Sequence, residues 1–327
     1  MNFDFNEEQT MIMDGIARYI REEYDFDRRR SIIESDSAYS DDVWRQFSEL
    51  GWLSIPFDES YGGFGGHADD LAGVMLELGK GLIIEPYMST VVVFGSLLNA
   101  SNNDSLKEQL IPRIINGQYK GSFAYAEEQS RFEISDVKTS AQKCGDGYKL
   151  NGTKIAVIDA KESDGLIVTA RTGGSQYGAE GISLFLVDTS AEGVAVSSYN
   201  TMDSHSSSTI NLENVFVTEA NLIVDEGEGF RHIESCLPQI LLCLSAEALG
   251  IMEVLNKLTV EYSKTRKQFG KPIGSFQALQ HRMVDNFMAF EQSKSMVYRG
   301  ICESTSFNKN DIDINQTNMW HKASLKF

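Results

Sequence analysis

The sequence predicts a multidomain α+β protein with an N-terminal helical domain, a middle antiparallel β domain and a C-terminal helical bundle. Two changes in hydrophobic period lead to this prediction. Apolar residues recur at helical spacing up to about residue 116, short β-branched runs follow from about residue 121, and helical spacing returns at about residue 231. A doubly wound fold would alternate strand and helix throughout, so this order excludes it. The predicted domains are residues 1–120, 121–229 and 230–327.

The N-terminal third starts with a recognisable helix signal. Asn6 is a good N-cap, Glu7 and Glu8 occupy the first turn, and apolar residues then recur at helical spacing. Further along, four glycines interrupt the helical pattern: Gly62, Gly63, Gly65 and Gly66. A P-loop would need a following Lys-Ser/Thr, and a dinucleotide-binding loop would need a preceding strand. Both are missing, so we predict a structural turn between helices rather than a phosphate site.

The middle third has the pattern of strands. Five runs rich in β-branched residues, separated by Gly, Asn and Asp, predict strands up to about residue 218. They are "GYKLNGTKIAVI", "DGLIVTART", "GISLFLVD", "GVAVSSYN" and "STINLENVFV". Two helices are predicted after them, from about Ile240 to Thr265 and from about Phe276 to Ser304.

The composition is typical of a soluble globular protein. Of 327 residues, 42% are hydrophobic and 23% are charged, and the net charge of −18 disfavours nucleic-acid binding because it repels a polyphosphate backbone. The N-terminus is acidic where a signal peptide needs basic residues, and the most apolar segments, such as residues 87–100 and 238–252, are shorter than the ~20 residues of a membrane helix. We therefore expect a cytoplasmic protein without a membrane span.

The cysteines and histidines show no ligand spacing. The four cysteines form no CxxC pair, and the five histidines show no metal-binding pattern. We expect no metal site, and buried free thiols in a reducing compartment.

A basic cluster stands out near the end of this acidic chain, in the stretch "TRKQFGKPIGSFQALQH" that begins at Thr265. It directly follows a long apolar helix and comprises Lys264, Arg266, Lys267 and Lys271.

Longer stretches of the sequence that match a known family suggest a function for this cluster. From Met1 to Phe327 the chain resembles the acyl-CoA dehydrogenase family, and within it is most similar to the small-subunit type of pimeloyl-CoA dehydrogenase. The matching stretches are "FNEEQTM", "ELGWLSIPFDESYGGFGG", "EPYMSTVV", "FAYAEEQSRFEISDVKTSA", "GYKLNGTK", "GISLFLVD" and "AEALGIMEVLNKLTVEYSKTRKQFGKPIGSFQALQHRM". The last is highly specific, whereas the glycine-rich loop alone would be weak. The resemblance implies FAD as the cofactor.

In that family the Arg-x-x-Phe-Gly turn lies at a subunit interface and reaches FAD held mainly by a neighbouring protomer. The resemblance implies that Arg266 pairs with the FAD pyrophosphate, that Gln268 and Phe269 contact the adenine end, and that Gln277 hydrogen-bonds the cofactor. The residue types suit these roles, since a guanidinium binds phosphate well and an aromatic face suits adenine. The alternative, a solvated helix end, explains the lysines but not Phe269 or Gln277, so we favour the cofactor site.

A second stretch, "FAYAEEQSR", corresponds in the family to the segment along the isoalloxazine ring. The resemblance implies that backbone groups of Tyr125, Ala126 and Glu127 hydrogen-bond the pyrimidine edge of the flavin. Two side chains depart from the family pattern. Ala126 stands where Thr is usual, and Ala156 begins an "AVI" run where Trp-Ile-Thr is usual. We expect weaker or differently shaped flavin binding.

The reaction of the family requires a carboxylate base opposite the flavin. In most members this glutamate lies in a C-terminal segment after a glycine-rich turn, and the resemblance places that segment beyond Phe327, so the C-terminal bundle is expected to be incomplete. A minority of members place the glutamate on the helix before the Arg motif, where this chain has Ile240. Glu247 lies about two turns later on that helix and is a poor candidate. The catalytic residue is therefore left unassigned.

The resemblance implies an FAD-dependent acyl-CoA dehydrogenase subunit that desaturates a CoA thioester at the α,β position. Electrons would pass to an electron-transfer flavoprotein, and the chain would work as a homo-oligomer or with a homologous large subunit. The alternative is a non-catalytic partner subunit or truncated paralogue, which the unassigned base and the replacements at Ala126 and Ala156 motivate.

Overall fold

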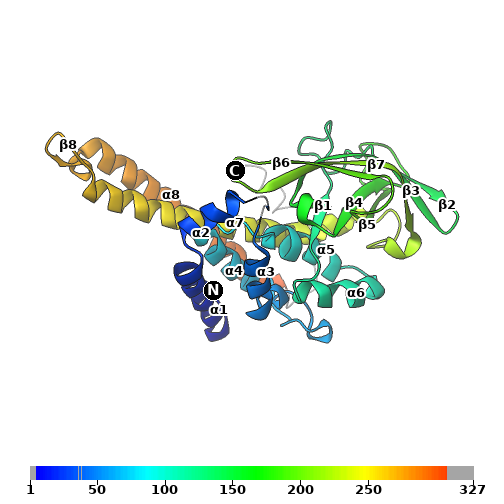
Figure 1. Ribbon diagram of the computed structural model, residues 1–327, viewed down its shortest axis with the longest axis horizontal. Coiled ribbons are helices and arrows are strands. Elements are labelled where there is room, and N and C mark those ends of the chain that lie inside the picture. The colour runs from blue at the N-terminus through cyan, green and yellow to red at the C-terminus, as the bar shows by residue number, and fades with distance from the viewer. Residues whose placement is uncertain (1–4, 36, 38, 308–327) are drawn as a thin grey trace. The chain divides into compact units, whose positions relative to one another are not determined.

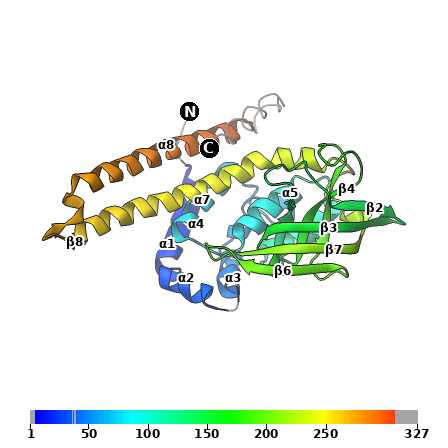
Figure 2. The ribbon, with the colours of Figure 1, turned by 90° about the horizontal axis from the view of Figure 1, so that it is seen from above.

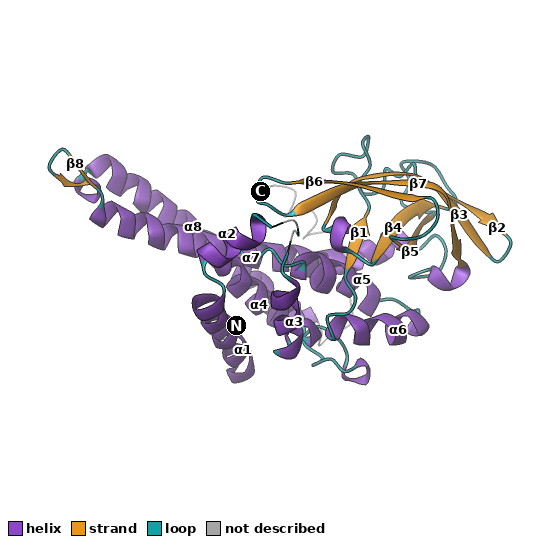
Figure 3. Cartoon of the chain, in the orientation of Figure 1, coloured by secondary structure: helices purple, strands orange, loops and turns teal. Residues whose placement is uncertain are grey.

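Helices, then strands, then helices follow one another along the chain, as Figures 1 and 3 show. The computed structural model describes residues 5–307, apart from residues 36 and 38. The predicted fold class is confirmed: an N-terminal helical part, a middle β part and a C-terminal helical part. The domain boundaries after residues 120 and 229 stay predictions.

The contacts divide the chain into two units, each built from separate segments. Unit 1 comprises Met1–Arg29, His67–Ile83 and Leu241–Phe327, and unit 2 comprises Arg30–Gly66 and Ile84–Ile240. Each unit is described by itself.

Unit 1 is helical. It contains α1 (Glu7–Glu23), α4 (Ala68–Gly81), most of α7 (Gly229–Thr265) and α8 (Gln277–Phe307). The predicted N-cap of α1 is confirmed, because the Gln9 amide donates to Asn6 Oδ1 at 2.8 Å and the Asn6 amide donates to Gln9 Oε1 at 2.9 Å. Figures 1 and 2 both show α7 and α8 running side by side as a hairpin.

Two glycines let α4 and α7 touch through their backbones. A Cβ added at Gly79 would lie 2.2 Å from the Glu247 carbonyl oxygen, and one at Gly250 would lie 2.0 Å from the Leu76 carbonyl oxygen. Only glycine fits at such a crossing. This contact fixes the position of α7 within unit 1.

The helix α7 begins at Gly229, eleven residues before the predicted start at Ile240. Proline lacks an N–H and crowds the preceding turn, yet the helix continues through Pro238. The length of this helix also bears on the expectation that the chain has no membrane span. By length and composition alone α7 could cross a membrane, since an 18-residue window of it has a mean hydropathy of 1.5.

Packing within unit 1 accounts for only part of this apolar composition, since 28% of the apolar window of α7 is buried. Besides its backbone contacts with α4, α7 presents Glu253 to Lys80 of α4, with Oε2 and Nζ 3.4 Å apart. The core helix of a globular fold has the same features as a membrane helix in sequence. The absence of a membrane span stays a prediction.

Unit 2 carries short helices and the β sheet. Its helical elements are α3 (Asp41–Glu49), a π-helical stretch (Met88–Phe94), α5 (Gly95–Asn99), α6 (Asp104–Ile115) and the first residues of α7, while α2 (Phe26–Ile33) begins in unit 1. Short 3₁₀ turns lie at Trp52–Ser54, Glu59–Tyr61, Ala160–Glu162 and Glu219–Asn221.

The seven strands of unit 2 form one sheet in the order β1-β4-β2-β3-β7-β6, with β5 paired to β4. They are β1 (Gly121–Ala124), β2 (Ser140–Cys144), β3 (Gly147–Ile158), β4 (Gly165–Arg171), β5 (Ile182–Asp188), β6 (Val194–Asn200) and β7 (Ser206–Thr218). The five predicted runs are β3 to β7. Their inward faces form one apolar core that includes Tyr148, Leu150, Phe185 and Ile210.

The sheet is mixed rather than purely antiparallel, which corrects the prediction. β1 pairs with β4 in parallel, and β2 joins β4 in parallel at Ser140 and Arg171. The antiparallel hairpin β2–β3 lies between β1 and β4 in the sequence. This long connection lets β4 run in the same direction as β1. Period and composition show strands but not their direction.

The glycine-rich loop is a structural turn. The amides of Gly63, Phe64, Gly65 and Gly66 all donate to backbone carbonyls of residues 54–58. A Cβ at Gly63 would lie 1.9 Å from the Phe57 carbonyl oxygen. These amides are therefore used by the protein and do not form a phosphate cradle.

The cysteines differ in burial. Cys236 and Cys243 are buried as expected, Cys302 is intermediate, and Cys144 is exposed at the end of β2. All four are free thiols.

Candidate functional site

The segment Tyr125–Glu127 leaves the sheet at the end of β1. The rings of Phe123 and Tyr125 stack on one face, with centroids 5.1 Å apart and planes inclined by 24°. Tyr125 is 39% exposed, and Ile158 at the end of β3 is 45% exposed. This part of unit 2 therefore offers apolar surface to a ligand.

The two peptide groups that flank Ala126 are held by other parts of unit 2. The Tyr125 carbonyl accepts from Lys154 Nζ at 3.3 Å and from Thr169 Oγ1 at 3.5 Å. The Ala126 carbonyl accepts from the Ile155 amide at 2.9 Å, and the Glu127 amide donates to Ser130 Oγ at 3.0 Å. Within the described part of the chain, the Ala126 N–H is the one group of these four that has no hydrogen-bond partner.

The strand β3 carries a bulge beside this segment. Its register against β7 shifts between Lys154 and Val157, and Ala156 has φ of 52°. A β-bulge reverses which alternate residues face the core, so Val157 is buried although Tyr148, Leu150 and Lys154 are the buried residues before the bulge. Left-handed backbone at a non-glycine residue is strained, and such residues gather at functional sites. The predicted segments around Ala126 and Ala156 are thus brought together.

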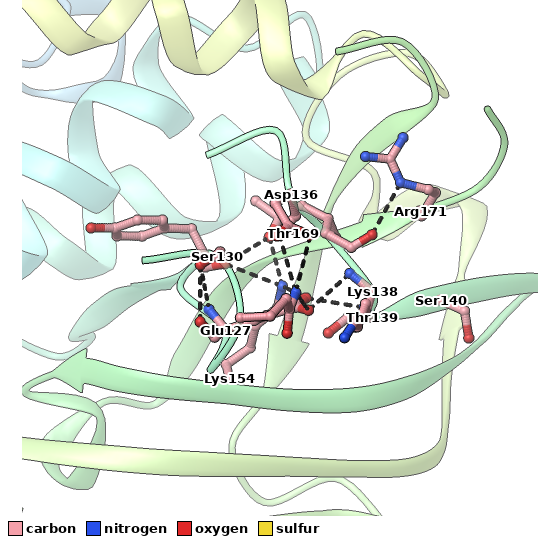
Figure 4. A network of polar contacts seen from close by, with 12 residues as sticks. Glu127, Ser130, Asp136, Lys138, Thr139, Ser140, Lys154, Thr169 and Arg171 are labelled. Atoms are coloured by element: carbon pink, nitrogen blue, oxygen red, sulfur yellow. Dashed lines mark hydrogen bonds and ion pairs between the residues drawn. The ribbon is translucent and has the colours of Figure 1, made fainter. Parts of the chain in front are cut away.

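An ion pair lies beneath the segment, as Figure 4 shows. Lys154 is fully buried and Glu127 is 3% exposed, and their charged groups are 2.7 Å apart. The other donors of Lys154 reach Thr169 Oγ1 at 2.8 Å and the Tyr125 carbonyl. All three ammonium hydrogens therefore have an acceptor, which a buried charge requires.

The pair is ionised at neutral pH. Burial raises the pKa of Glu127, but the Lys154 charge and hydrogen bonds from Lys154, Gln129 and Thr139 outweigh it and lower this pKa to about 2. Burial lowers the pKa of Lys154 to about 8, against the opposing effect of Glu127.

Glu127 also anchors the loop that follows it. Its carboxylate accepts from the Lys138 amide at 2.8 Å, the Thr139 amide at 3.0 Å and Gln129 Nε2 at 2.8 Å. Arg171, at the end of β4, binds carbonyl oxygens of the same loop, with Nη2 2.8 Å from Ser135 O and Nε 3.1 Å from Val137 O. Loop 127–139 is therefore held from both β3 and β4 (Figure 4).

The second group of predicted residues lies in unit 1, at the tip of the α7–α8 hairpin. β8 (Lys267–Gln268) and β9 (Lys271–Pro272) pair across Phe269 and Gly270, whose φ values are 52° and 80°. Two positive φ values at a two-residue loop are typical of a type I′ turn. The turn holds the Phe269 side chain outward, at 92% exposure.

The structure thus gathers the four predicted residues at this tip. Arg266 directly follows α7, Gln268 lies in β8, and Gln277 begins α8, all with exposed side chains. The Phe276 ring meets Phe269 edge to face at 6.2 Å. An exposed cation and an exposed aromatic ring suit a nucleotide-containing cofactor.

The expected base is not found at the alternative position. Ile240 is a half-buried apolar residue of α7 and has no acid–base chemistry. Glu247 is half-buried too, and its backbone contacts Gly79 of α4. The other expected position lies outside the described residues.

The sequence interpretation missed Lys154, Thr169 and Arg171. Lys154 lay within a matching motif but had no role assigned. A signal was present, because alternation in β3 puts residue 154 on the inward face with Tyr148 and Leu150. A lysine at an inward position needs a buried acceptor, and "FAYAEE" supplies one.

Three models of protein-family domains match nearly the whole chain. The acyl-CoA dehydrogenase N-terminal domain matches residues 6–118, the middle domain residues 122–215 and the C-terminal domain residues 227–320. The chain belongs to the acyl-CoA dehydrogenase family.

Individual relatives and solved structures are also similar to this chain. The chain is 31% identical to the probable acyl-CoA dehydrogenase YngJ of Bacillus subtilis, over 91% of this chain and 80% of that protein. Butyryl-CoA dehydrogenase from Megasphaera elsdenii superimposes with a TM-score of 0.84 at 26% identity, over 94% of this chain and 82% of that one. The FAD complex of PigA gives 0.86 at 26% identity, over 94% and 81%.

Proposed function

We propose that this chain is an FAD-dependent acyl-CoA dehydrogenase subunit that desaturates a CoA thioester between its α and β carbons. Family membership supports the oxidoreductase class, and the similarity to an FAD complex and to a butyryl-CoA dehydrogenase supports the cofactor and the thioester substrate. The length and branching of the acyl group are left open.

One observation of the site carries the proposal. The Ala126 amide has no acceptor among the described residues, while the Tyr125 carbonyl, the Ala126 carbonyl and the Glu127 amide all have hydrogen-bond partners, and the stacked rings of Phe123 and Tyr125 precede it in the chain. A flat aromatic cofactor with acceptors along one edge fits such a donor set. The exposed Arg266 and Phe269 suit its phosphate and adenine groups.

When bound, FAD would accept the hydride that leaves the β-carbon of the substrate. Residues of two protomers would bind and orient it: the Ala126 amide of one protomer at the ring edge, and Arg266, Gln268, Phe269 and Gln277 of a neighbouring protomer at the other end. The base that removes the α-proton must be a carboxylate, and we assign it to a segment outside the described residues or to a partner subunit.

We also propose an oligomer, either of this chain or with a homologous large subunit, and an electron-transfer flavoprotein as the electron acceptor. The tip of the α7–α8 hairpin exposes its cofactor-binding residues, as a residue that reaches a neighbouring protomer must. A cytoplasmic location is part of this proposal.

Substitution of Arg266 tests the cofactor site. We expect Arg266→Ala to weaken FAD binding by roughly 10- to 100-fold, the usual loss for a hydrogen bond to a charged group. FAD affinity is measured by flavin fluorescence, and bleaching of the flavin by acyl-CoA is followed in anaerobic solution. Lys264→Ala is the matched control, because Lys264 pairs with Glu261 at 2.8 Å and is equally exposed. Equal affinity in both variants would remove Arg266 from the site.

A non-catalytic partner subunit is the second candidate. It is favoured by the absence of a carboxylate at Ile240 and by the replacement of the usual family residues at Ala126 and Ala156. Such a subunit would keep the fold yet show no bleaching with any acyl-CoA, alone or with its large-subunit partner.

A further inference from the structure

The orientation of the Ala126 amide is fixed by what holds the carbonyl of the same peptide group. The Tyr125 carbonyl and the Ala126 N–H belong to one peptide unit, and the described chain contains no cis peptide bond. In a trans peptide these two dipoles point in opposite directions. Whatever binds the Tyr125 carbonyl therefore directs the Ala126 N–H away from itself.

Lys154 binds that carbonyl from the protein interior. Its ammonium is fully buried, and it is fixed by Glu127 Oε1 at 2.7 Å and Thr169 Oγ1 at 2.8 Å. The third donor reaches the Tyr125 carbonyl at 3.3 Å. The carbonyl thus points into the protein, and the Ala126 N–H points outward from it.

The neighbouring peptide group is held as well, so the segment cannot turn. The Ala126 carbonyl accepts from Ile155 of β3, and the Glu127 amide donates to Ser130 Oγ. Lys154 is thus the only charged group of the described residues that acts on the peptide whose N–H is left over.

We propose that Lys154 is a positioning residue for the flavin, acting through the Tyr125–Ala126 peptide group to aim and strengthen the Ala126 N–H as a donor to the pyrimidine edge. This deepens the proposed function and rests on it. A cation on the carbonyl end of a peptide polarises its N–H, and hydrogen-bond chains strengthen in this way. The reduced flavin carries more negative charge at that edge, so the donor stabilises the reduced form and raises the reduction potential.

The test must separate this role from a structural one. Lys154→Met alone would leave the Glu127 carboxylate buried without its cation, which risks unfolding. The double variant Lys154→Met/Glu127→Gln removes both buried charges together, and the one amide oxygen of Gln can still accept from either the Lys138 or the Thr139 amide, which bind the two carboxylate oxygens of Glu127. Glu127→Gln alone retains Lys154 as a donor to the Tyr125 carbonyl but removes its counter-ion, so it serves as the reference at a temperature where its melt shows it folded. Lys149→Met, an exposed position on the same strand, controls for the loss of a lysine from β3.

The readouts are FAD affinity, the flavin absorption spectrum and the reduction potential of folded protein, with a cooperative melt as the test of folding. We expect the double variant to bind FAD roughly tenfold more weakly than Glu127→Gln, with a shifted spectrum and a more negative potential. We expect Lys149→Met to match the unmodified chain.

Two results would overturn the inference in different ways. If the double variant folds and matches Glu127→Gln in affinity, spectrum and potential, Lys154 has no positioning role while the proposed function stands. If the unmodified chain binds no FAD at all, the proposed function fails and this inference fails with it.

Discussion

At the scale of single residues, the site depends on a charge that is costly to bury. A buried ion pair stabilises a protein little by itself, because desolvation offsets the attraction, but breaking one costs about 3–5 kcal/mol. Lys154 and Glu127 lie at 0% and 3% exposure, so each needs the other. Glu127 serves two purposes, since it also binds the amides of Lys138 and Thr139.

Glu127→Gln tests this dependence. We expect a loss of about 3 kcal/mol or more in the free energy of unfolding at neutral pH, because the buried Lys154 loses its counter-ion. Urea denaturation measures it, with Glu128→Gln as the control, since Glu128 is the adjacent exposed carboxylate. A loss below about 1 kcal/mol would show that the pair does not hold the segment.

The same pair predicts how stability depends on pH. The folded pKa of Glu127, about 2, lies below its ordinary value of 4.5, so its contribution is present above about pH 4.5 and lost as pH falls toward 2. Melting temperatures between pH 6 and pH 3 should therefore fall less steeply in Glu127→Gln than in the unmodified chain. Parallel curves would contradict the assigned pKa.

At the scale of elements, the crossing of α4 and α7 sets the geometry of unit 1. The crossing is a contact of backbone atoms at Gly79 and Gly250, and backbone cannot move aside as a side chain can.

Alanine substitutions test the crossing. Gly250→Ala should destabilise the protein by about 1–3 kcal/mol, since its Cβ would meet the Leu76 carbonyl. Gly15→Ala in α1 is the matched control, because nothing lies within 4 Å of its Cβ and alanine favours helix by up to about 1 kcal/mol. Thermal melts of the two variants should move in opposite directions, and a stabilised Gly250→Ala would refute the close contact.

Local patterns in the sequence predicted most helices and strands. Features that depend on contacts between distant segments were not predicted. Asn6 and the five strand runs are local patterns, as are the residues of the hairpin tip around Arg266. The parallel pairing of β1 with β4 and the continuation of α7 through Pro238 depend on tertiary contacts. The roles of Lys154 and Arg171 were missed for the same reason, since both bind the segment 125–139, which lies well before them in the sequence. The functional assignment of Arg266, Gln268, Phe269 and Gln277 stays a prediction.

At the scale of the whole molecule, unit 1 exposes apolar side chains along the α7–α8 hairpin. Each is at least 50% exposed: Leu255, Leu258, Tyr262, Val284, Phe287, Met288 and Met296. Apolar surface that is this extensive on two adjacent helices promotes association.

We therefore expect the purified chain to self-associate or to require a partner. Light scattering after size exclusion should show oligomers at micromolar concentration, and the double variant Phe287→Glu/Met288→Glu should shift the population toward monomer. Val196→Glu on β6, which is also exposed, is the control. A monodisperse, cooperatively melting monomer of the unmodified chain would contradict this expectation.

The visible absorption spectrum of the purified chain, alone and co-purified with its large-subunit neighbour, tests the central claim most directly. The account predicts an oxidised-flavin spectrum that survives gel filtration in stoichiometric amount, because the Ala126 amide of one protomer and the Arg266 tip of its neighbour bind the same FAD. A protein that is colourless in both preparations, and stays so after incubation with FAD, would contradict it.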